Sequence, residues 1–169
     1  MLAPFGVAVA AGTGFFAMLR GAQKGTFDPR GVPSMLIGHP PPPFVLDGLT
    51  DADLRGAKRP VLVNFFASWC APCIEESSVL LDLKNAGADL IGIAWKDHPA
   101  DTDRFLATHG DPFARRTADP TGTVAIDWGV TGVPETYLVS GGIVRWRWTS
   151  ALTPDSVREA LLPALRAAA

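Results

Sequence analysis

Cys70 and Cys73 are the only cysteines of the chain, and two residues separate them in the stretch VNFFASWCAPCIEE. Such a pair can serve as a structural disulfide clip, as half of a metal site, or as a redox pair that alternates between dithiol and disulfide. Small proteins that rely on disulfides for stability usually carry several cysteines at spread spacings. This pair therefore acts locally, and hydrophobic packing must hold the core together.

The surroundings of the pair favour redox chemistry. A zinc site would need two further ligands, and His39, His98 and His109 show no ligand-like spacing. Cys70 lies where an apolar stretch gives way to a helix, whose unpaired N–H groups and dipole favour thiolate over thiol. We therefore predict that Cys70 is the attacking sulfur and that Cys73, one turn later, resolves the mixed disulfide.

The elements that position the cysteines follow from the pattern of apolar residues and of helix and turn signals. We predict strands at residues 60–68 and 89–95, a short strand and turn within 112–122, a hairpin over 134–148 with its turn at 140–142, and helices at 70–87, 99–110 and 153–169. Pro163 should kink or shorten the last helix. This order predicts an α/β fold with a mixed central sheet flanked by helices.

The N-terminal region differs in composition from the rest of the chain. Residues 2–19 contain no charged residue and approach the roughly 20 residues that a bilayer-spanning helix needs. The run has no polar face, unlike a core helix, and no basic segment precedes it, unlike a cleaved signal peptide. We predict a transmembrane anchor at residues 1–20, a linker rich in glycine and proline at 21–37, and one domain at 38–169.

Charge excludes one class of function and leaves the orientation in the membrane open. The net charge is −2, with lysines and arginines scattered along the chain, so nucleic acid binding is excluded. The basic residues near the apolar run follow it, and by the positive-inside rule they would place the domain in the cytoplasm.

A second motif, GVTGVPETYLV, opens the predicted hairpin with Pro134. A proline here removes a hydrogen-bond donor from the sheet, and a cis bond before it would turn the preceding backbone outward. An ordinary edge proline is the alternative. The hairpin ends in VRWRW, residues 144–148, whose period of two predicts that the tryptophans face the core and the arginines face water.

Together, VLVNFFASWCAPC and GVTGVPETYLV resemble the thioredoxin superfamily and, more closely, its CcmG/DsbE branch of membrane-anchored thiol reductases of cytochrome c maturation. The resemblance runs from about Gly38 to the final helix. It implies a thioredoxin-like fold with a central insertion at about 94–127 and a cis bond between Val133 and Pro134. The backbone of Val133 would then pair with an extended substrate. The resemblance also implies a signal anchor and a periplasmic domain, which we adopt over the charge count.

The resemblance draws attention to further site residues. Ordinary thioredoxin has a buried aspartate in its central strand where this chain has Asn64. Glu76 and Glu135, matched by glutamates in the branch, are therefore candidates to accept the proton of Cys73 or to select the substrate. Glu76 alternatively stabilises the helix dipole, and Glu135 alternatively begins a strand in water. We further predict that Trp69, rather than packing in the core, lines a substrate groove beside an exposed Cys70 sulfur, together with Pro72 of the intervening dipeptide.

The resulting prediction is a periplasmic, membrane-anchored thiol:disulfide oxidoreductase that acts as a reductant. Its substrate would be the disulfide of apocytochrome c or of a thiol carrier, and an integral membrane protein would supply the electrons. We expect a monomer with no cofactor beyond the Cys70–Cys73 disulfide. Alternatives are a thiol reductase for copper-site assembly in an oxidase, and a module that binds Cu(I) or apocytochrome without turnover.

Overall fold

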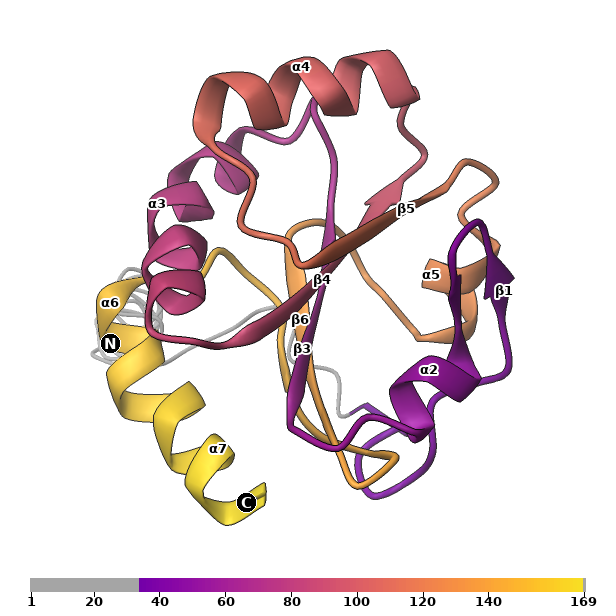
Figure 1. The fold of residues 1–169 in the computed structure, drawn as a ribbon, viewed down its shortest axis with the longest axis vertical. Coiled ribbons are helices and arrows are strands. Elements are labelled where there is room, and N and C mark those ends of the chain that lie inside the picture. The colour runs from indigo at the N-terminus through magenta and orange to yellow at the C-terminus, as the bar shows by residue number, and fades with distance from the viewer. Residues whose placement is uncertain (1–33, 169) are drawn as a thin grey trace, which may run out of the picture. The chain divides into compact units, whose positions relative to one another are not determined.

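A computed structural model describes residues 34–168 of the chain (Figure 1). The predicted anchor at 1–20 and most of the predicted linker lie outside the described residues. Within residues 34–168, no helix is both long enough and apolar enough to cross a membrane. Leu36, which we assigned to the linker, packs partly against the core of the domain.

A five-stranded sheet forms the centre of the domain, in the order β5-β4-β3-β6-β7. Its strands are β3 (Val61–Phe66), β4 (Asp89–Trp95), β5 (Arg115–Asp119), β6 (Glu135–Ser140) and β7 (Ile143–Trp148). β4 lies parallel to β3 and β5 parallel to β4, whereas β6 is antiparallel to both β3 and β7. All six residues of β3 are buried, as expected of a central strand with both faces covered. The predicted mixed sheet is confirmed.

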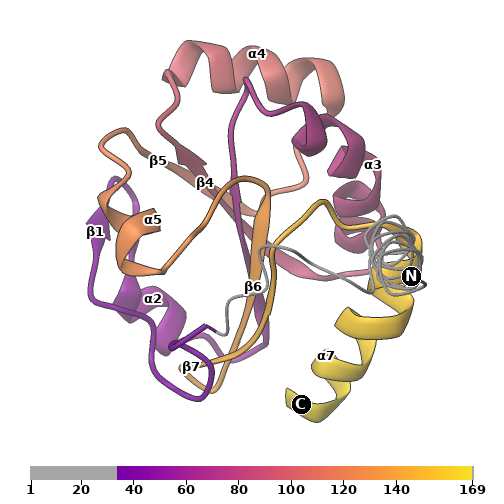
Figure 2. The same cartoon turned by 180° about the vertical axis from the view of Figure 1, so that it is seen from behind.

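Helices cover both faces of this sheet, as Figures 1 and 2 show: α3 and α7 lie on one side, α2 and α5 on the other. The predicted helices appear as α3 (Ala71–Asn85), α4 (Pro99–His109) and a C-terminal run of α6 (Pro154–Ser156), the π-helical η1 (Val157–Leu161) and α7 (Leu162–Ala168). Pro163 has no N–H for the helical ladder, and the π-helical turn immediately before it accommodates that loss. The proline therefore disturbs the helix without ending it.

Several short elements were not predicted. They are β1 (Val45–Leu46), β2 (Leu49–Thr50), α2 (Asp51–Arg55) and α5 (Thr123–Asp127). Each has five residues or fewer, too few for a hydrophobic period to become visible. The segment predicted as a central insertion, about 94–127, contains α4, β5 and α5.

The core contains two aromatic clusters on opposite faces of β3, because successive strand residues point in opposite directions. On one face, the ring of Phe65 lies 5.5 Å from Trp128 and 5.9 Å from Tyr137. On the other face, the ring of Phe66 lies 4.8 Å from that of Phe113. All of these side chains are buried, so β3 is held in place from both sides up to the residue where it leads into the cysteine motif.

Strand β7 departs from the predicted alternation. Leu138 of β6 pairs with Trp146 and the next residue, Val139, pairs with Val144, so Arg145 is the extra residue of a β-bulge. Since paired residues share a face, the bulge moves Arg147 to the same face as Val144. The prediction that both arginines face water is therefore wrong: Arg145 is exposed, but the side chain of Arg147 is only 7% exposed.

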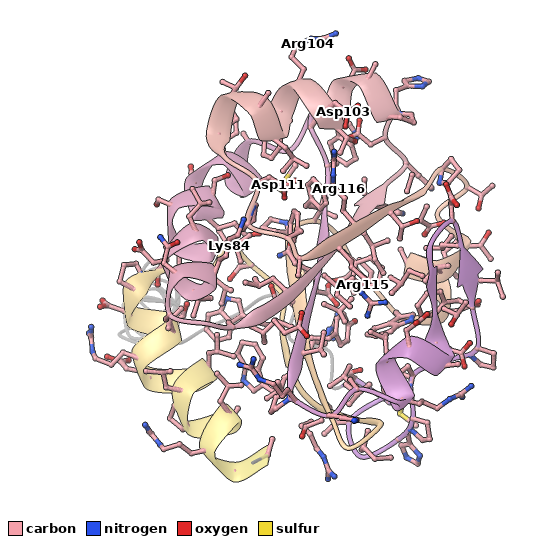
Figure 3. All side chains as sticks on the ribbon, in the orientation of Figure 1. Lys84, Asp103, Arg104, Asp111, Arg115 and Arg116 are labelled. Atoms are coloured by element: carbon pink, nitrogen blue, oxygen red, sulfur yellow. A yellow bond between two sulfur atoms is a disulfide. The ribbon has the colours of Figure 1, made fainter. Side chains whose placement is uncertain are left out.

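Charged side chains join α4 and the loop after it to β5 and α3 (Figure 3). Arg116 of β5 lies 2.7 Å from Asp103 of α4 and 3.5 Å from Asp111, and Lys84 of α3 donates to the carbonyl oxygen of Asp111 at 2.7 Å. Pairs at such exposed positions contribute little to stability, roughly 0–1 kcal/mol each. The packing of Phe113 against the sheet is therefore the stronger attachment.

That packing can be tested at Gly92 of β4, where a Cβ atom would lie 2.7 Å from the ring of Phe113. We predict that Gly92→Ala lowers the free energy of unfolding in urea by about 1–3 kcal/mol, because the ring has to move out of its place. The smaller side chain of Phe113→Leu should reduce this penalty in the double variant. An equal penalty in both backgrounds would contradict the proposed contact.

Candidate active site

Cys70 and Cys73 form a disulfide where β3 leads into α3, with their Cα atoms 5.3 Å apart. Cys70 is the N-cap residue of the helix, and its Sγ accepts a hydrogen bond from the backbone N–H of Cys73 at 3.2 Å. Pro72 lies in the first turn, where its missing N–H costs nothing. The predicted position of Cys70 at a helix N-terminus, which favours a thiolate, is thus confirmed.

Both cysteine residues lie just below the surface, Cys70 with 4% and Cys73 with 3% of its area exposed. The expectation of an exposed Cys70 sulfur is therefore wrong for the disulfide form, and burial does not distinguish the two cysteines. The surface beside them is apolar: Trp69 is 58% exposed, Ile74 is 43% exposed, and Pro72 is exposed as well. An exposed tryptophan beside a redox pair is not core packing, which leaves Trp69 available to a ligand.

Asp97, which the sequence analysis missed, fixes the turn that precedes Cys70. Its carboxylate accepts hydrogen bonds from the N–H of Ser68 at 2.6 Å and from the Ser68 hydroxyl at 2.7 Å. It also accepts from the Thr102 hydroxyl and from the N–H of His98, both at 2.9 Å. Asp97 therefore joins this turn to the start of α4. The sequence did contain a signal for this role: Asp97 directly follows β4, and the parallel pairing of β3 with β4 brings that point beside the end of β3.

The bond between Val133 and Pro134 is cis, as predicted. Phe65 pairs with Glu135, so continuing the antiparallel register places Pro134 and Val133 beside the end of β3, next to the turn that carries the cysteines. Within residues 34–168, no backbone hydrogen bond involves Val133. Its N–H and C=O thus have no backbone partner among these residues.

Glu76 is completely buried. One carboxylate oxygen, Oε1, accepts from the side-chain amide of Asn64 and the other, Oε2, from the N–H of Leu152, both at 2.9 Å. Burial raises the pKa of Glu76 to about 7, although these two hydrogen bonds oppose the shift. Glu76 lies beyond the first turn of α3, where a charge interacts little with the helix dipole, so the structure does not favour the alternative of a dipole-stabilising acid. Cys73, Asn64 and Glu76 border a common cavity of about 10 Å³, close to the smallest that holds one water.

Glu135 is also completely buried, so the alternative of a strand start in water is wrong. Its Oε1 lies 2.6 Å from Nε of Arg147 and accepts from the Tyr137 hydroxyl at 2.5 Å. Its Oε2 accepts from the N–H and the hydroxyl of Thr131 at 3.1 and 3.2 Å. Burial and then the negative charge of Glu135 raise the pKa of Tyr137, which keeps the phenol protonated. The sequence analysis missed Arg147 because it assigned that side chain to the water-facing side.

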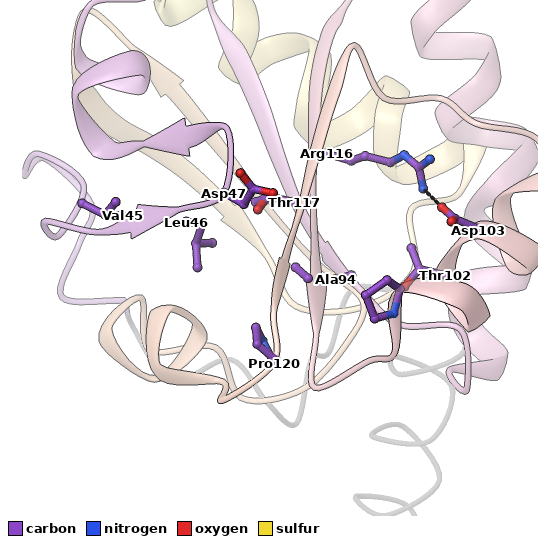
Figure 4. A pocket seen from close by; sticks show the side chains of 11 residues that line it. Val45, Leu46, Asp47, Ala94, Thr102, Asp103, Arg116, Thr117 and Pro120 are labelled. Atoms are coloured by element: carbon purple, nitrogen blue, oxygen red, sulfur yellow. Dashed lines mark hydrogen bonds and ion pairs between the residues drawn. The ribbon is translucent and has the colours of Figure 1, made fainter.

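A cavity of about 600 Å³ lies elsewhere, between β1, β5 and the start of α4 (Figure 4). In that view Arg116 points toward Asp103, and Leu46, Ala94 and Pro120 provide apolar walls. None of the predicted site residues lines this cavity. Among the described residues, no three His, Cys, Asp or Glu side chains are grouped so that they could hold a metal ion.

Comparisons with known proteins agree with this geometry. The Redoxin family model matches residues 37–150. The chain is 42% identical over 161 residues to the thiol:disulfide interchange protein HelX of Rhodobacter capsulatus, covering 91% of this chain and 88% of HelX. It is 36% identical over 143 residues to DsbE of Escherichia coli, covering 80% of this chain and 77% of that protein.

A solved structure of similar fold is a candidate thiol:disulfide interchange protein DsbE from Chlorobium tepidum, with a TM-score of 0.61 and 26% identity over 78% of this chain and 96% of that one. The likeness agrees with the thioredoxin-like arrangement of sheet and helices described above. By sequence, by fold and by its Cys70–Cys73 pair, the chain belongs to the DsbE/CcmG-type thiol:disulfide interchange proteins and is a thiol:disulfide oxidoreductase.

Proposed function

We propose that this protein is a membrane-anchored periplasmic reductase that delivers electrons to the disulfide of apocytochrome c, or of a thiol carrier that holds it, during cytochrome c maturation. The observation that carries the proposal is a redox pair together with a nearby backbone segment that has no hydrogen-bond partner in the sheet. Continuing the register of β3 and β6 brings Val133 beside the turn that carries Cys70 and Cys73, and its N–H and C=O have no backbone partner within the described residues. An extended polypeptide that contains a disulfide fits this arrangement.

In the proposed reaction, the Cys70 thiolate attacks one sulfur of the substrate disulfide. A bond forms between Cys70 and that sulfur, and the other substrate sulfur leaves as a thiolate. The Cys73 thiolate then attacks Sγ of Cys70, which releases the second substrate thiolate and leaves the disulfide seen in the structure. Two electrons pass from the protein to the substrate. Because attack requires a thiolate, the N-terminus of α3 favours the first step.

The substrate would lie across the exposed apolar surface at Trp69 and Pro72 and pair with the backbone of Val133. The indole Nε1 of Trp69 donates to the carbonyl oxygen of Lys96 at 3.3 Å, and its ring lies 5.8 Å from that of Trp95. These contacts hold the indole in one orientation while more than half of its surface remains exposed. A flat apolar surface of this kind accepts many peptide sequences, because its contacts are not directional.

Glu76 is the proposed acceptor of the proton that Cys73 must lose before it attacks. A carboxyl group with a pKa of about 7 exchanges protons readily with groups that titrate near neutral pH. The small cavity that Glu76 shares with Cys73 and Asn64 provides a route through one water molecule. Asn64 itself cannot take up a proton, but its amide donates to both Glu76 and Thr136 and so holds the carboxylate in place.

The oxidised protein must be reduced again before another turnover. The periplasm is kept oxidising, so the electrons would come from an integral membrane donor. An anchor at residues 1–20 would confine the domain to the membrane surface, where such a donor is found.

Trapping identifies the substrate. In Cys73→Ser the mixed disulfide on Cys70 cannot be resolved, so mass spectrometry of the disulfide-linked partners from the native host should recover precursors of c-type cytochromes or their thiol carrier. The control Cys70→Ser lacks the attacking sulfur and should capture far less. Recovery of oxidase subunits would instead support copper-site assembly. Tight Cu(I) binding without any covalent partner would support a binding module.

The direction of electron flow can be measured separately. We predict a reduction potential near that of thioredoxin, about −270 mV, from equilibration with redox buffers followed by thiol alkylation. A potential near that of the oxidant DsbA, about −120 mV, would contradict the role of a reductant.

The raised pKa of Glu76 predicts a specific dependence of stability on pH. Between the usual pKa of 4.5 and the folded-state pKa of about 7, the unfolded chain loses this proton while the folded protein keeps it, so stability falls as pH rises. Urea unfolding of the oxidised protein should show that its stability relative to Glu76→Gln declines by on the order of 3 kcal/mol over this window. The exposed neighbour provides the control: Glu75→Gln should follow the wild type. Parallel pH profiles for wild type and Glu76→Gln would refute the raised pKa.

A further inference from the structure

The two buried glutamates beside the cysteines have different surroundings. The carboxylate of Glu76 accepts two hydrogen bonds, one on each oxygen. The carboxylate of Glu135 accepts from four groups: the Nε of Arg147, the hydroxyl of Tyr137, and the N–H and hydroxyl of Thr131. These four donors occupy the acceptor positions of both oxygens and tie the carboxylate to three neighbouring residues. Glu135 is therefore suited to holding the surrounding structure in place.

The partner of Glu135 is Arg147, which reaches it from β7. Arg147 pairs with Tyr137 across the sheet, and the β-bulge turns its side chain toward the face that carries Glu135. Its Nη2 also donates to the carbonyl oxygen of Gly129 at 3.2 Å and to the hydroxyl oxygen of Thr131 at 3.4 Å. Burial alone would lower the pKa of Arg147. The hydrogen bond to Glu135 and the charge of Glu135 outweigh this effect, so the pKa is raised overall and the guanidinium stays charged.

The segment that these bonds hold is the loop 129–134, which connects α5 to β6 and carries Val133 and the cis bond. Arg147 binds the loop at its first residue, Gly129, and at Thr131, while Glu135 closes it from the other end. The hydroxyl of Thr131 accepts from Arg147 and donates to Glu135, which completes a ring of three side chains. The loop is therefore attached to the sheet on both sides of Val133.

We propose that Arg147 is a positioning residue for disulfide reduction: through Glu135 and Thr131 it holds the loop 129–134 so that the backbone of Val133 faces an extended substrate at Cys70. This inference rests on the proposed pairing of Val133 with the substrate. It assigns to Glu135 a structural part in substrate binding and leaves the proton of Cys73 to Glu76. Arg147 acts only through the loop and has no part in the chemistry of the thiols.

The test separates peptide binding from thiol chemistry. The pre-reduced full-length protein is mixed with a short, otherwise extended synthetic peptide that contains one disulfide, and the single-turnover rate is measured against peptide concentration. The same protein is also mixed with 5,5′-dithiobis(2-nitrobenzoate), a small disulfide that cannot pair as a strand. The alkylation rate of Cys70 against pH reports the thiolate directly.

Arg147→Met should raise the half-saturating peptide concentration about tenfold, because a charged hydrogen-bonded anchor of the loop is lost. Its limiting rate, its rate with the small disulfide and its alkylation profile should match the wild type. Arg147→Lys keeps the charge without the planar fork and should restore binding only in part. Thr131→Val leaves the ion pair between Arg147 and Glu135 intact and should also weaken peptide binding. It provides the test of the network if Arg147→Met does not fold. Arg145→Met is the matched control, since Arg145 is exposed on the same strand.

Three results would overturn the inference. An unchanged half-saturating concentration in both Arg147→Met and Thr131→Val would show that the loop does not depend on this network. An equal loss with the peptide and the small disulfide, or a shifted alkylation profile, would assign Arg147 to the thiol chemistry. A wild-type rate that never saturates with the peptide would refute the pairing at Val133 and this inference with it. Because the peptide is generic, none of these results depends on apocytochrome c being the natural substrate.

Discussion

A carboxylate that is removed from water must be surrounded by hydrogen-bond donors, and the active site of this protein is arranged around three such groups. Asp97 holds the turn before Cys70, Glu76 lies behind Cys73, and Glu135 holds the loop with the cis bond. Each joins segments that are distant in sequence: Glu76, for example, connects β3 to the backbone of Leu152. The need to satisfy these carboxylates therefore fixes the relative positions of the pieces that form the site.

The two glutamates differ in the number of hydrogen-bond donors around their carboxylates, and we assign them different roles on that basis. Glu76 has two donors in an apolar environment, so desolvation dominates and a proton can bind near neutral pH. Glu135 has four donors, one of them the guanidinium of Arg147, and these bonds hold its side chain in one position. The same residue type can thus supply a proton site on one side of the cysteines and a rigid support on the other.

Features of the fold and the site were predictable where residues close together in the sequence determine them. β4 was predicted to the residue, and the cysteine pair at the start of α3 and the cis bond were also predicted, because their signals are local or belong to a motif. The burial of Glu76 was missed, since an acid near the start of a helix looks the same in the sequence whether it is buried or exposed. A signal was nevertheless present: position 76 falls three residues after Cys73 and four before Leu80, on the stripe that faces the sheet, whereas Glu75 falls outside it.

The partner of Glu135 could not have been found from periodicity. Arg145 and Arg147 are two residues apart, so a regular strand would place both on one face. The pairing of β6 with β7 gains one residue at Arg145, and this shift, which depends on the partner strand, turns only Arg147 toward Tyr137. A β-bulge beside an active site is a common means of redirecting a side chain. Here it places a charge beside the loop that carries Val133, which links an irregularity in an edge strand to the proposed pairing of Val133 with a substrate.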